Sequence, residues 1–127
     1  LKAITKIIFE RKRIYCYYSN LFKNIDGLKL QIFSPKVKPV MWTFAVVLDP
    51  KAFTDRDIII KIMKTKGIET RNGFYSPNRL SLYRGCNTSN LRYSEILSKN
   101  IICLPFFTSL KEKEMEYIAK TLLNLKR

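Results

Sequence analysis

The stretch KPVMWTFAVVLDPKAFTDRDIIIKIMKTKGIETR, residues 38–71, contains the signals that decide the fold. Residues 41–49 are rich in β-branched and aromatic side chains and stop at an Asp-Pro pair, which predicts a β-strand. Their nearly continuous apolar character predicts that both faces of this strand are at least partly covered. Trp42 is predicted to lie in the core, because large aromatic side chains are mostly buried.

A helix is predicted to follow this strand, beginning at Thr54 and ending at Gly67. Asp55 and Asp57 fall in its first turn, where carboxylates cap free amides and complement the helix dipole. Capping therefore explains this acidic pair better than acid–base catalysis does. Residues 68–70 are predicted to be short and extended. The inner stripe of the helix consists of three apolar residues: Ile59, Ile62 and Met63.

Upstream, residues 3–22 are predicted to form a helix, and residues 28–33 a short extended piece. The basic run at residues 11–13, Arg-Lys-Arg, is predicted to be a solvated helix face. Apolar residues recur through the helix at near-helical spacing: Ile4, Ile7, Ile8, Tyr15, Tyr18, Leu21 and Phe22.

Downstream, residues 71–90 lack a clear period and are predicted to be loop-like. A short helix at residues 93–99 and a strand at residues 101–104 are predicted next. A final helix follows, for which Ser109 and Glu112 form a capping-box pattern. The order of elements predicts one α/β or α+β domain over residues 1–127, with helices covering a small sheet. The apolar face of the last helix is Met115, Ile118, Ala119, Leu122 and Leu125.

The composition limits the chemistry that the chain performs alone. It has 24 Lys and Arg against 10 Asp and Glu, a net charge of +14, so anionic partners are expected. It contains no histidine, which excludes Ser-His-Asp and Cys-His catalysis and most zinc sites. Cys16, Cys86 and Cys103 have no metal-like spacing, and Cys103 is predicted to be a buried free thiol. No signal peptide or membrane span is recognisable, so a reducing, cytoplasmic compartment is expected.

The stretch KGIETRNGFYSPNRLSLY, residues 66–83, resembles the C-terminal domain of the DegT/DnrJ/EryC1/StrS family of PLP-dependent nucleotide-sugar aminotransferases. Members read G-I-x-T-R-P, then aromatics and P-x-H-x-Q, then a Tyr. Residues 67–71 match the first motif, while Phe74, Tyr75 and Tyr83 fit the aromatic positions. Four other segments resemble the family in the same order: ERKRIYCYYSNLF, KPVMWTFAVVLD, DRDIIIKIMKTKGIETR and SEILSKNIICLPFFTSLKEKEMEYIAKTL.

The resemblance implies a fold and a set of site residues. The fold is the small domain of a fold-type-I aminotransferase, with about three mainly antiparallel strands covered by helices. The substrate-facing residues are Arg71, Asn78 and Tyr83. The chain departs from the family at Asn72, where Pro is usual, at Asn78, where His is usual, and at Leu80, where Gln is usual. An amide can form hydrogen bonds but cannot act as an acid or a base, so Asn78 alters this part of the site.

The resemblance also implies a function. Full-length relatives transfer an amino group, with glutamate as the expected donor, to a keto-sugar nucleotide, for amino-sugar biosynthesis in surface polysaccharide or similar glycoconjugates. They are usually homodimers. Their Schiff-base lysine and PLP contacts lie in a larger N-terminal domain, so this chain, whose first residue is Leu1, is expected to lack that domain. No catalytic residue, metal or PLP is expected on it, and it is expected to be inactive alone.

Two other interpretations remain open at this stage. The positive charge and the tyrosines are compatible with a nucleic-acid-binding module, although no specific nucleic acid is expected. An orphaned domain with a structural or regulatory role is the other alternative. It predicts exposed apolar surface around the first helix and self-association.

Overall fold

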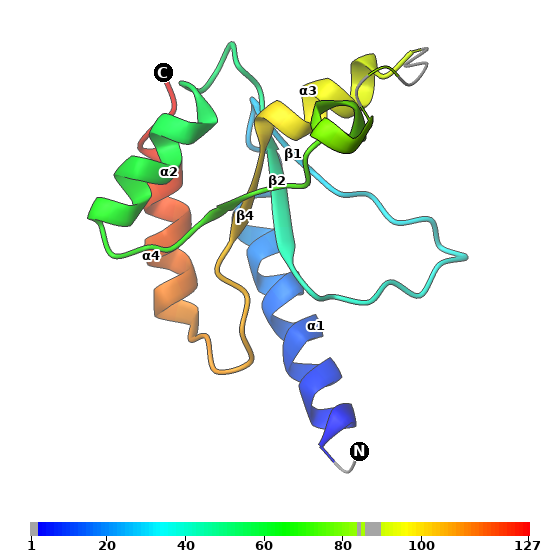
Figure 1. Cartoon of the computed structure of the whole chain (residues 1–127). Helices are drawn as coiled ribbons and strands as arrows, with labels where there is room; N and C mark the ends of the chain where they lie inside the picture. Colours follow the sequence, from blue (N-terminus) through cyan, green and yellow to red (C-terminus); the bar gives the residue numbers. More distant parts are fainter. Residues whose placement is uncertain (1–2, 84, 86–89) are drawn as a thin grey trace.

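The computed structural model describes residues 3–83, 85 and 90–127 (Figure 1). Two short 3-10 turns, η1 (Pro77–Arg79) and η2 (Ser81–Tyr83), lie in the segment that was predicted to be loop-like. Cys86 lies outside the described residues. The helices and strands follow one another as α1 (Ile4–Leu21), β1 (Leu28–Leu30), β2 (Phe44–Leu48), α2 (Arg56–Thr65), β3 (Arg71–Asn72), α3 (Arg92–Asn100), β4 (Ile101–Leu104) and α4 (Glu112–Leu123).

The strands form one antiparallel sheet in the order β1-β2-β4-β3. This confirms the predicted α/β class and the antiparallel pairing. The sheet has four strands where about three were expected, because Leu28–Leu30 pairs with the outer edge of β2. At the centre, Cys103 lies between Ala45 on β2 and Arg71 on β3.

One face of the sheet carries the core. Along β2, Phe44, Val46 and Leu48 are buried, while the residues between them are half-buried, as the continuous apolar run predicted. The ring of Phe44 stacks on Tyr18 at 4.9 Å and on Phe22 at 6.0 Å, which joins α1 to the sheet. Because this face is packed and closed, any site on the sheet must lie on its other face.

The first two turns of α1 extend beyond the sheet (Figure 1). Ile4, Ile7 and Ile8 were predicted to belong to the apolar stripe, but they are 50%, 43% and 60% exposed. The predicted helix is present, but its buried stripe begins only at Ile14, where α1 reaches the core.

The last helix begins later than the predicted capping box at Ser109 and Glu112. The N-terminal cap is Lys111, whose backbone N–H donates to the Glu114 carboxylate at 2.7 Å. The Ser109 prediction was wrong because Leu110, which is 2% exposed, packs into the core first. By contrast, the capping role of Asp55 is confirmed, since it accepts from the Asp57 amide at 2.8 Å, although α2 begins at Arg56 and not at Thr54.

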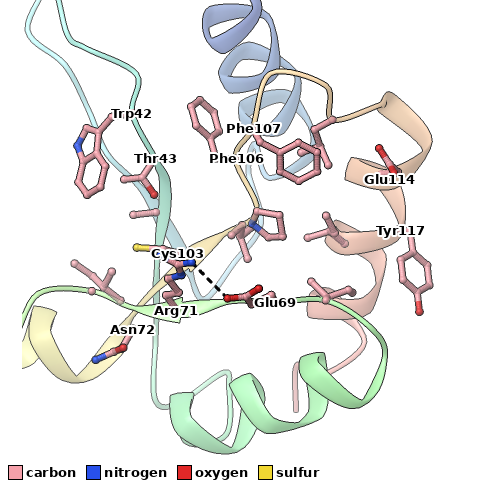
Figure 2. Close-up of a pocket in the computed structure, with 18 of the residues that line it drawn as sticks. Trp42, Thr43, Glu69, Arg71, Asn72, Cys103, Phe106, Phe107, Glu114 and Tyr117 are labelled. Atoms are coloured by element: carbon pink, nitrogen blue, oxygen red, sulfur yellow. Dashed lines mark hydrogen bonds and ion pairs between the residues drawn. The ribbon is translucent and has the colours of Figure 1, made fainter.

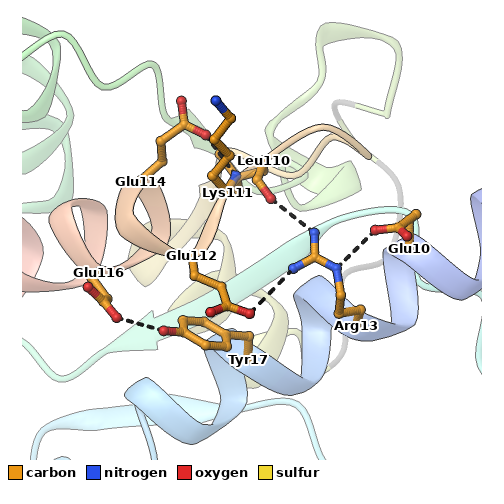
Figure 3. Close-up of polar contacts among 8 residues, drawn as sticks. All are labelled: Glu10, Arg13, Tyr17, Leu110, Lys111, Glu112, Glu114 and Glu116. Atoms are coloured by element: carbon orange, nitrogen blue, oxygen red, sulfur yellow. Dashed lines mark hydrogen bonds and ion pairs between the residues drawn. The ribbon is translucent and has the colours of Figure 1, made fainter.

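Arg13 shows why the basic run on α1 is not simply a solvated face (Figure 3). Its guanidinium donates to Glu10 Oε2 at 2.9 Å and to the backbone oxygen of Leu110 at 3.1 Å, and it lies 4.0 Å from Glu112. One turn further along α1, the Tyr17 hydroxyl donates to Glu116 at 2.7 Å. These contacts fasten α1 to the beginning of α4.

Candidate functional site

The sheet face opposite the core forms the floor of an open cleft of about 1220 Å³ (Figure 2). Ala45, Cys103 and Arg71 lie side by side across this floor, by the register of the sheet. The walls come from the segment before β2, the chain after β3, residues 105–110 and α4. The cleft is therefore built from segments that are far apart in the sequence.

Arg71, the first predicted site residue, lies in this cleft. Its guanidinium forms one ion pair, to Glu69 Oε1 at 3.4 Å, and the two side chains are 79% and 81% exposed. An exposed pair of this kind contributes about 0–1 kcal/mol to stability. The guanidinium can therefore exchange Glu69 for another anion at little cost.

Cys103 lies on the cleft floor and is half-buried rather than buried as predicted. Burial raises the pKa of its thiol, although a hydrogen bond with Thr43 and the charge of Arg71 act in the opposite direction. A thiol with a raised pKa is a poor nucleophile at neutral pH, because the thiolate is the reactive form. In the described part of the chain, no group of three or more metal-ligating side chains comes together.

Asn78, the second predicted site residue, lies in η1 and not in the cleft lining. Its amide donates to Glu95 Oε1 on α3 at 2.7 Å and its oxygen accepts from the Ser76 hydroxyl. The Ser76 amide in turn donates to the buried Ser98 hydroxyl at 3.2 Å. Asn78 thus fastens the 73–83 segment to α3, and both its amide nitrogen and its oxygen have a hydrogen-bond partner there.

Tyr83, the third predicted site residue, lies in η2 with 44% of its surface exposed. It is not a core residue, and it does not line the cleft. The structure therefore brings Arg71 to the cleft but leaves Asn78 and Tyr83 on the neighbouring loop.

Trp42 is a cleft residue that the sequence placed wrongly in the core. It is 58% exposed, and its ring lies 6.0 Å from that of Phe74, tilted by 40°. The prediction failed because the regular strand begins only at Phe44. Arg11 on α1 donates to the backbone oxygens of Met41 at 3.2 Å and Trp42 at 2.9 Å. Arg11 therefore holds the chain at the cleft wall. Like Arg13, it is a structural contact and not simply part of the solvated face that was predicted for residues 11–13.

Comparison with known proteins decides the family. The sequence model of the DegT/DnrJ/EryC1/StrS aminotransferase family matches residues 1–123. The chain belongs to this family. The resemblance that was seen in residues 66–83 is confirmed over nearly the whole chain.

Three similar proteins illustrate the DegT/DnrJ/EryC1/StrS relationship. A dTDP-4-amino-4,6-dideoxy-D-glucose transaminase of Escherichia coli is 28% identical over 97% of the chain and 34% of its own length. DesI, solved in the presence of its TDP-sugar product, has a TM-score of 0.87 and 21% identity over 97% of this chain and 32% of its own. PseC of Helicobacter pylori, involved in pseudoaminic acid biosynthesis, has a TM-score of 0.84 and 20% identity, over 98% of this chain and 34% of its own. The chain thus spans about a third of the length of each.

Members of the DegT/DnrJ/EryC1/StrS family depend on PLP, but the described residues do not fit this cofactor. A Schiff-base lysine needs an apolar or electropositive pocket, and every lysine that the structure describes is exposed. Lys113 is the lysine among the cleft-lining residues, and it lies in the exposed first turn of α4. None of the described lysines therefore has the surroundings that a PLP Schiff base needs.

Proposed function

We propose that this chain is the C-terminal domain of an aminotransferase that transfers an amino group from glutamate to a nucleotide-linked keto-sugar. The proposal rests on the family match over residues 1–123, together with the exposed guanidinium of Arg71 in the open cleft. Two of the similar proteins are named for, or solved with, a dTDP- or TDP-linked sugar. The product would serve amino-sugar biosynthesis for surface polysaccharide or a similar glycoconjugate.

The proposed roles follow from charge and position. Arg71 would face the anionic part of a substrate, because a guanidinium binds phosphate and carboxylate oxygens in pairs. Asn78 and Tyr83 would contact substrate from the neighbouring loop. The PLP-bearing lysine would lie in a separate N-terminal domain, which supplies the transfer chemistry, so the 127 residues alone would be inactive.

The whole enzyme would work as a homodimer in the cytoplasm, without a membrane or a specific nucleic acid as partner. No helix among the described residues combines the length and apolar character needed to cross a bilayer. Exposed apolar side chains on the first turns of α1 would be covered in the complete assembly.

The intact mass of the native protein tests the domain arrangement. We expect a species about three times heavier than 15.0 kDa, since the chain spans about a third of its relatives. Borohydride reduction of that species should fix PLP on a lysine outside these 127 residues. A native species of 15.0 kDa that neither binds PLP nor associates with a PLP-binding chain would overturn the proposal.

A further inference from the structure

Four residues, Ser76, Asn78, Glu95 and Ser98, form a loop clamp between α3 and the turns beside it (Figure 1). The backbone N–H of Ser76 donates to the Ser98 hydroxyl at 3.2 Å, and the side-chain nitrogen of Asn78 donates to Glu95 Oε1 at 2.7 Å. Glu95 and Ser98 lie three residues apart on α3, so they face the same side of the helix. Phe74, two residues before Ser76, lines the cleft, so the loop clamp begins two residues from the cleft lining.

Arg56 holds the end of α3 that carries Ser98. Its side chain is 9% exposed, and its guanidinium donates to the backbone oxygen of Ser98 at 2.6 Å and to that of Ile101 at 3.5 Å. A cation is favourable at this end of a helix, because the last carbonyls carry partial negative charge. Asp57 pairs with the same guanidinium at 2.8 Å. The start of α2 therefore fixes the position from which α3 presents Glu95 and Ser98.

The loop clamp decides which end of the Asn78 side-chain amide faces α3. A carboxylate only accepts hydrogen bonds, so Glu95 can be met by the nitrogen of the amide but not by its oxygen. From the other side, the Ser76 hydroxyl donates to the Asn78 oxygen. The amide nitrogen carries two N–H groups, and among the described residues the Glu95 carboxylate accepts one of them. Residue 78 therefore keeps one N–H donor that a ligand oxygen can use.

We propose that Glu95 is a positioning residue, which fixes the Asn78 amide so that its second N–H donates to an oxygen of the sugar-nucleotide substrate. This inference rests on the proposed function, in which Asn78 contacts substrate from the loop. The two ends of an amide have nearly the same shape, so an asparagine without such a partner can present either its oxygen or its N–H groups. Glu95 removes this choice, and residue 78 then selects a hydrogen-bond acceptor on the substrate.

Exchanging the two functional groups separates the loop clamp from the free N–H donor. Asn78→Asp alone places a second carboxylate against Glu95, so the loop should detach. Amide hydrogen exchange of residues 76–80 in the native protein should then become about ten-fold faster or more. Adding Glu95→Gln should restore the original exchange, because the new amide donates to the new carboxylate. The double variant keeps the loop clamp and the net charge, but residue 78 now carries acceptors only.

The kinetic constants of this double variant test the role of Glu95. We expect the KM for a TDP-linked keto-sugar to rise about ten-fold, with kcat within about two-fold of the original, because a substrate contact is lost while the loop stays in place. Ser81→Asp places a carboxylate on the same loop at an exposed position and is the control for the new charge. It should leave the KM unchanged.

Three outcomes would overturn the role of Glu95 while leaving the proposed function intact. They are an unchanged KM in the double variant with normal loop exchange, an equal rise of KM in Ser81→Asp, and loop exchange that Asn78→Asp does not alter. The absence of amino transfer by the unmodified native protein would overturn the proposed function, and the substrate contact of Asn78 with it. The exchange measurement does not depend on activity, so it distinguishes that failure from the loss of the loop clamp.

Discussion

Thr70 is a buried polar residue that lacks a hydrogen bond within the described structure. The residue is 7% exposed, and its hydroxyl oxygen has no partner among the described residues. A buried hydroxyl without a partner costs about 1–3 kcal/mol by mutational data. Thr70 directly precedes Arg71 in the chain. The packing around Thr70 therefore also fixes the backbone position from which the Arg71 side chain extends into the cleft.

Replacing Thr70 by valine should therefore raise the free energy of unfolding by about 1 kcal/mol, because valine has the same shape without the hydroxyl. Urea unfolding with an unchanged m-value measures this. Thr121→Val is the matched control, since the Thr121 hydroxyl donates to the Tyr117 carbonyl at 2.7 Å and its removal should give no gain. A loss of stability in Thr70→Val would show that the hydroxyl has a partner in solution.

Gly73 permits the close approach of the chain after β3 to β4. A Cβ at this position would lie 2.6 Å from Ile101 Cγ2. Gly73→Ala should cost about 1–3 kcal/mol, and most of that cost should disappear in an Ile101→Ala background, where the clash is removed. Gly67→Ala is the control. Gly67 has a φ of +75° and a Cβ there would meet open space, so the cost of this substitution comes from the backbone and should not depend on Ile101. Equal costs of Gly73→Ala in both backgrounds would contradict this account.

At the scale of elements, the contact between α1 and α4 gives a prediction of pH dependence. The hydrogen bond from Tyr17 to the Glu116 carboxylate raises the pKa of Tyr17 to about 12, because a phenolate there would face a negative charge. This contact stabilises the fold below pH ~10, the ordinary tyrosine pKa, and the stabilisation is lost as the pH rises through about 12.

Glu116→Gln should lower the pKa of Tyr17 toward its ordinary value of about 10. A titration followed by NMR of ¹³C-labelled tyrosine measures this. Glu69→Gln, in the distant cleft, is the control and should leave the Tyr17 resonance unchanged. An unaltered Tyr17 pKa in Glu116→Gln would show that the hydrogen bond does not persist in solution.

The elements also show how much of the fold could be predicted from sequence. Strand β2 was predictable from its apolar run, and helix α2 from its Asp cap and the Gly after its last turn. These signals lie within or directly beside the element that they specify. The start of α4 was not, because the burial of Leu110 and the bond from Arg13 to its carbonyl come from tertiary contacts. Trp42 was misplaced because the regular strand begins only at Phe44, and the hydrogen bond that its backbone accepts comes from Arg11, 31 residues away in sequence.

At the scale of the whole molecule, the sequence identified the family but could not assemble the cleft in which Arg71 lies. Its floor comes from β2, β4 and β3, and α4 supplies one wall, so their meeting depends on sheet order and helix packing, which periodicity does not give. Asn78 and Tyr83 lie outside the cleft lining, and Asn78 is held beside α3 by its hydrogen bond to Glu95 and by the bond from the Ser76 amide to Ser98. Their contact with substrate stays a prediction.

The exposed turns of α1 lead to a prediction about association. Ile8 and Phe9 are 60% and 66% exposed, which creates an apolar surface together with Ile4 and Ile7. The 127-residue chain should self-associate in sedimentation equilibrium, and the double variant Ile8→Lys with Phe9→Lys should shift it toward monomer. Ile32→Lys with Val40→Lys adds the same charge on the 31–43 segment and should leave association unchanged. A wild-type monomer at high concentration would contradict the prediction.

The most direct test of the central claim is amino transfer by the native protein isolated from its source. With PLP, glutamate and a TDP-linked keto-sugar present, we expect an amino-sugar nucleotide to form, and Arg71→Gln in the same protein to lower kcat/KM by about ten-fold or more through loss of a charge-assisted contact. A folded native protein that binds PLP but forms no amino-sugar nucleotide from any nucleotide-linked keto-sugar offered would contradict the claim.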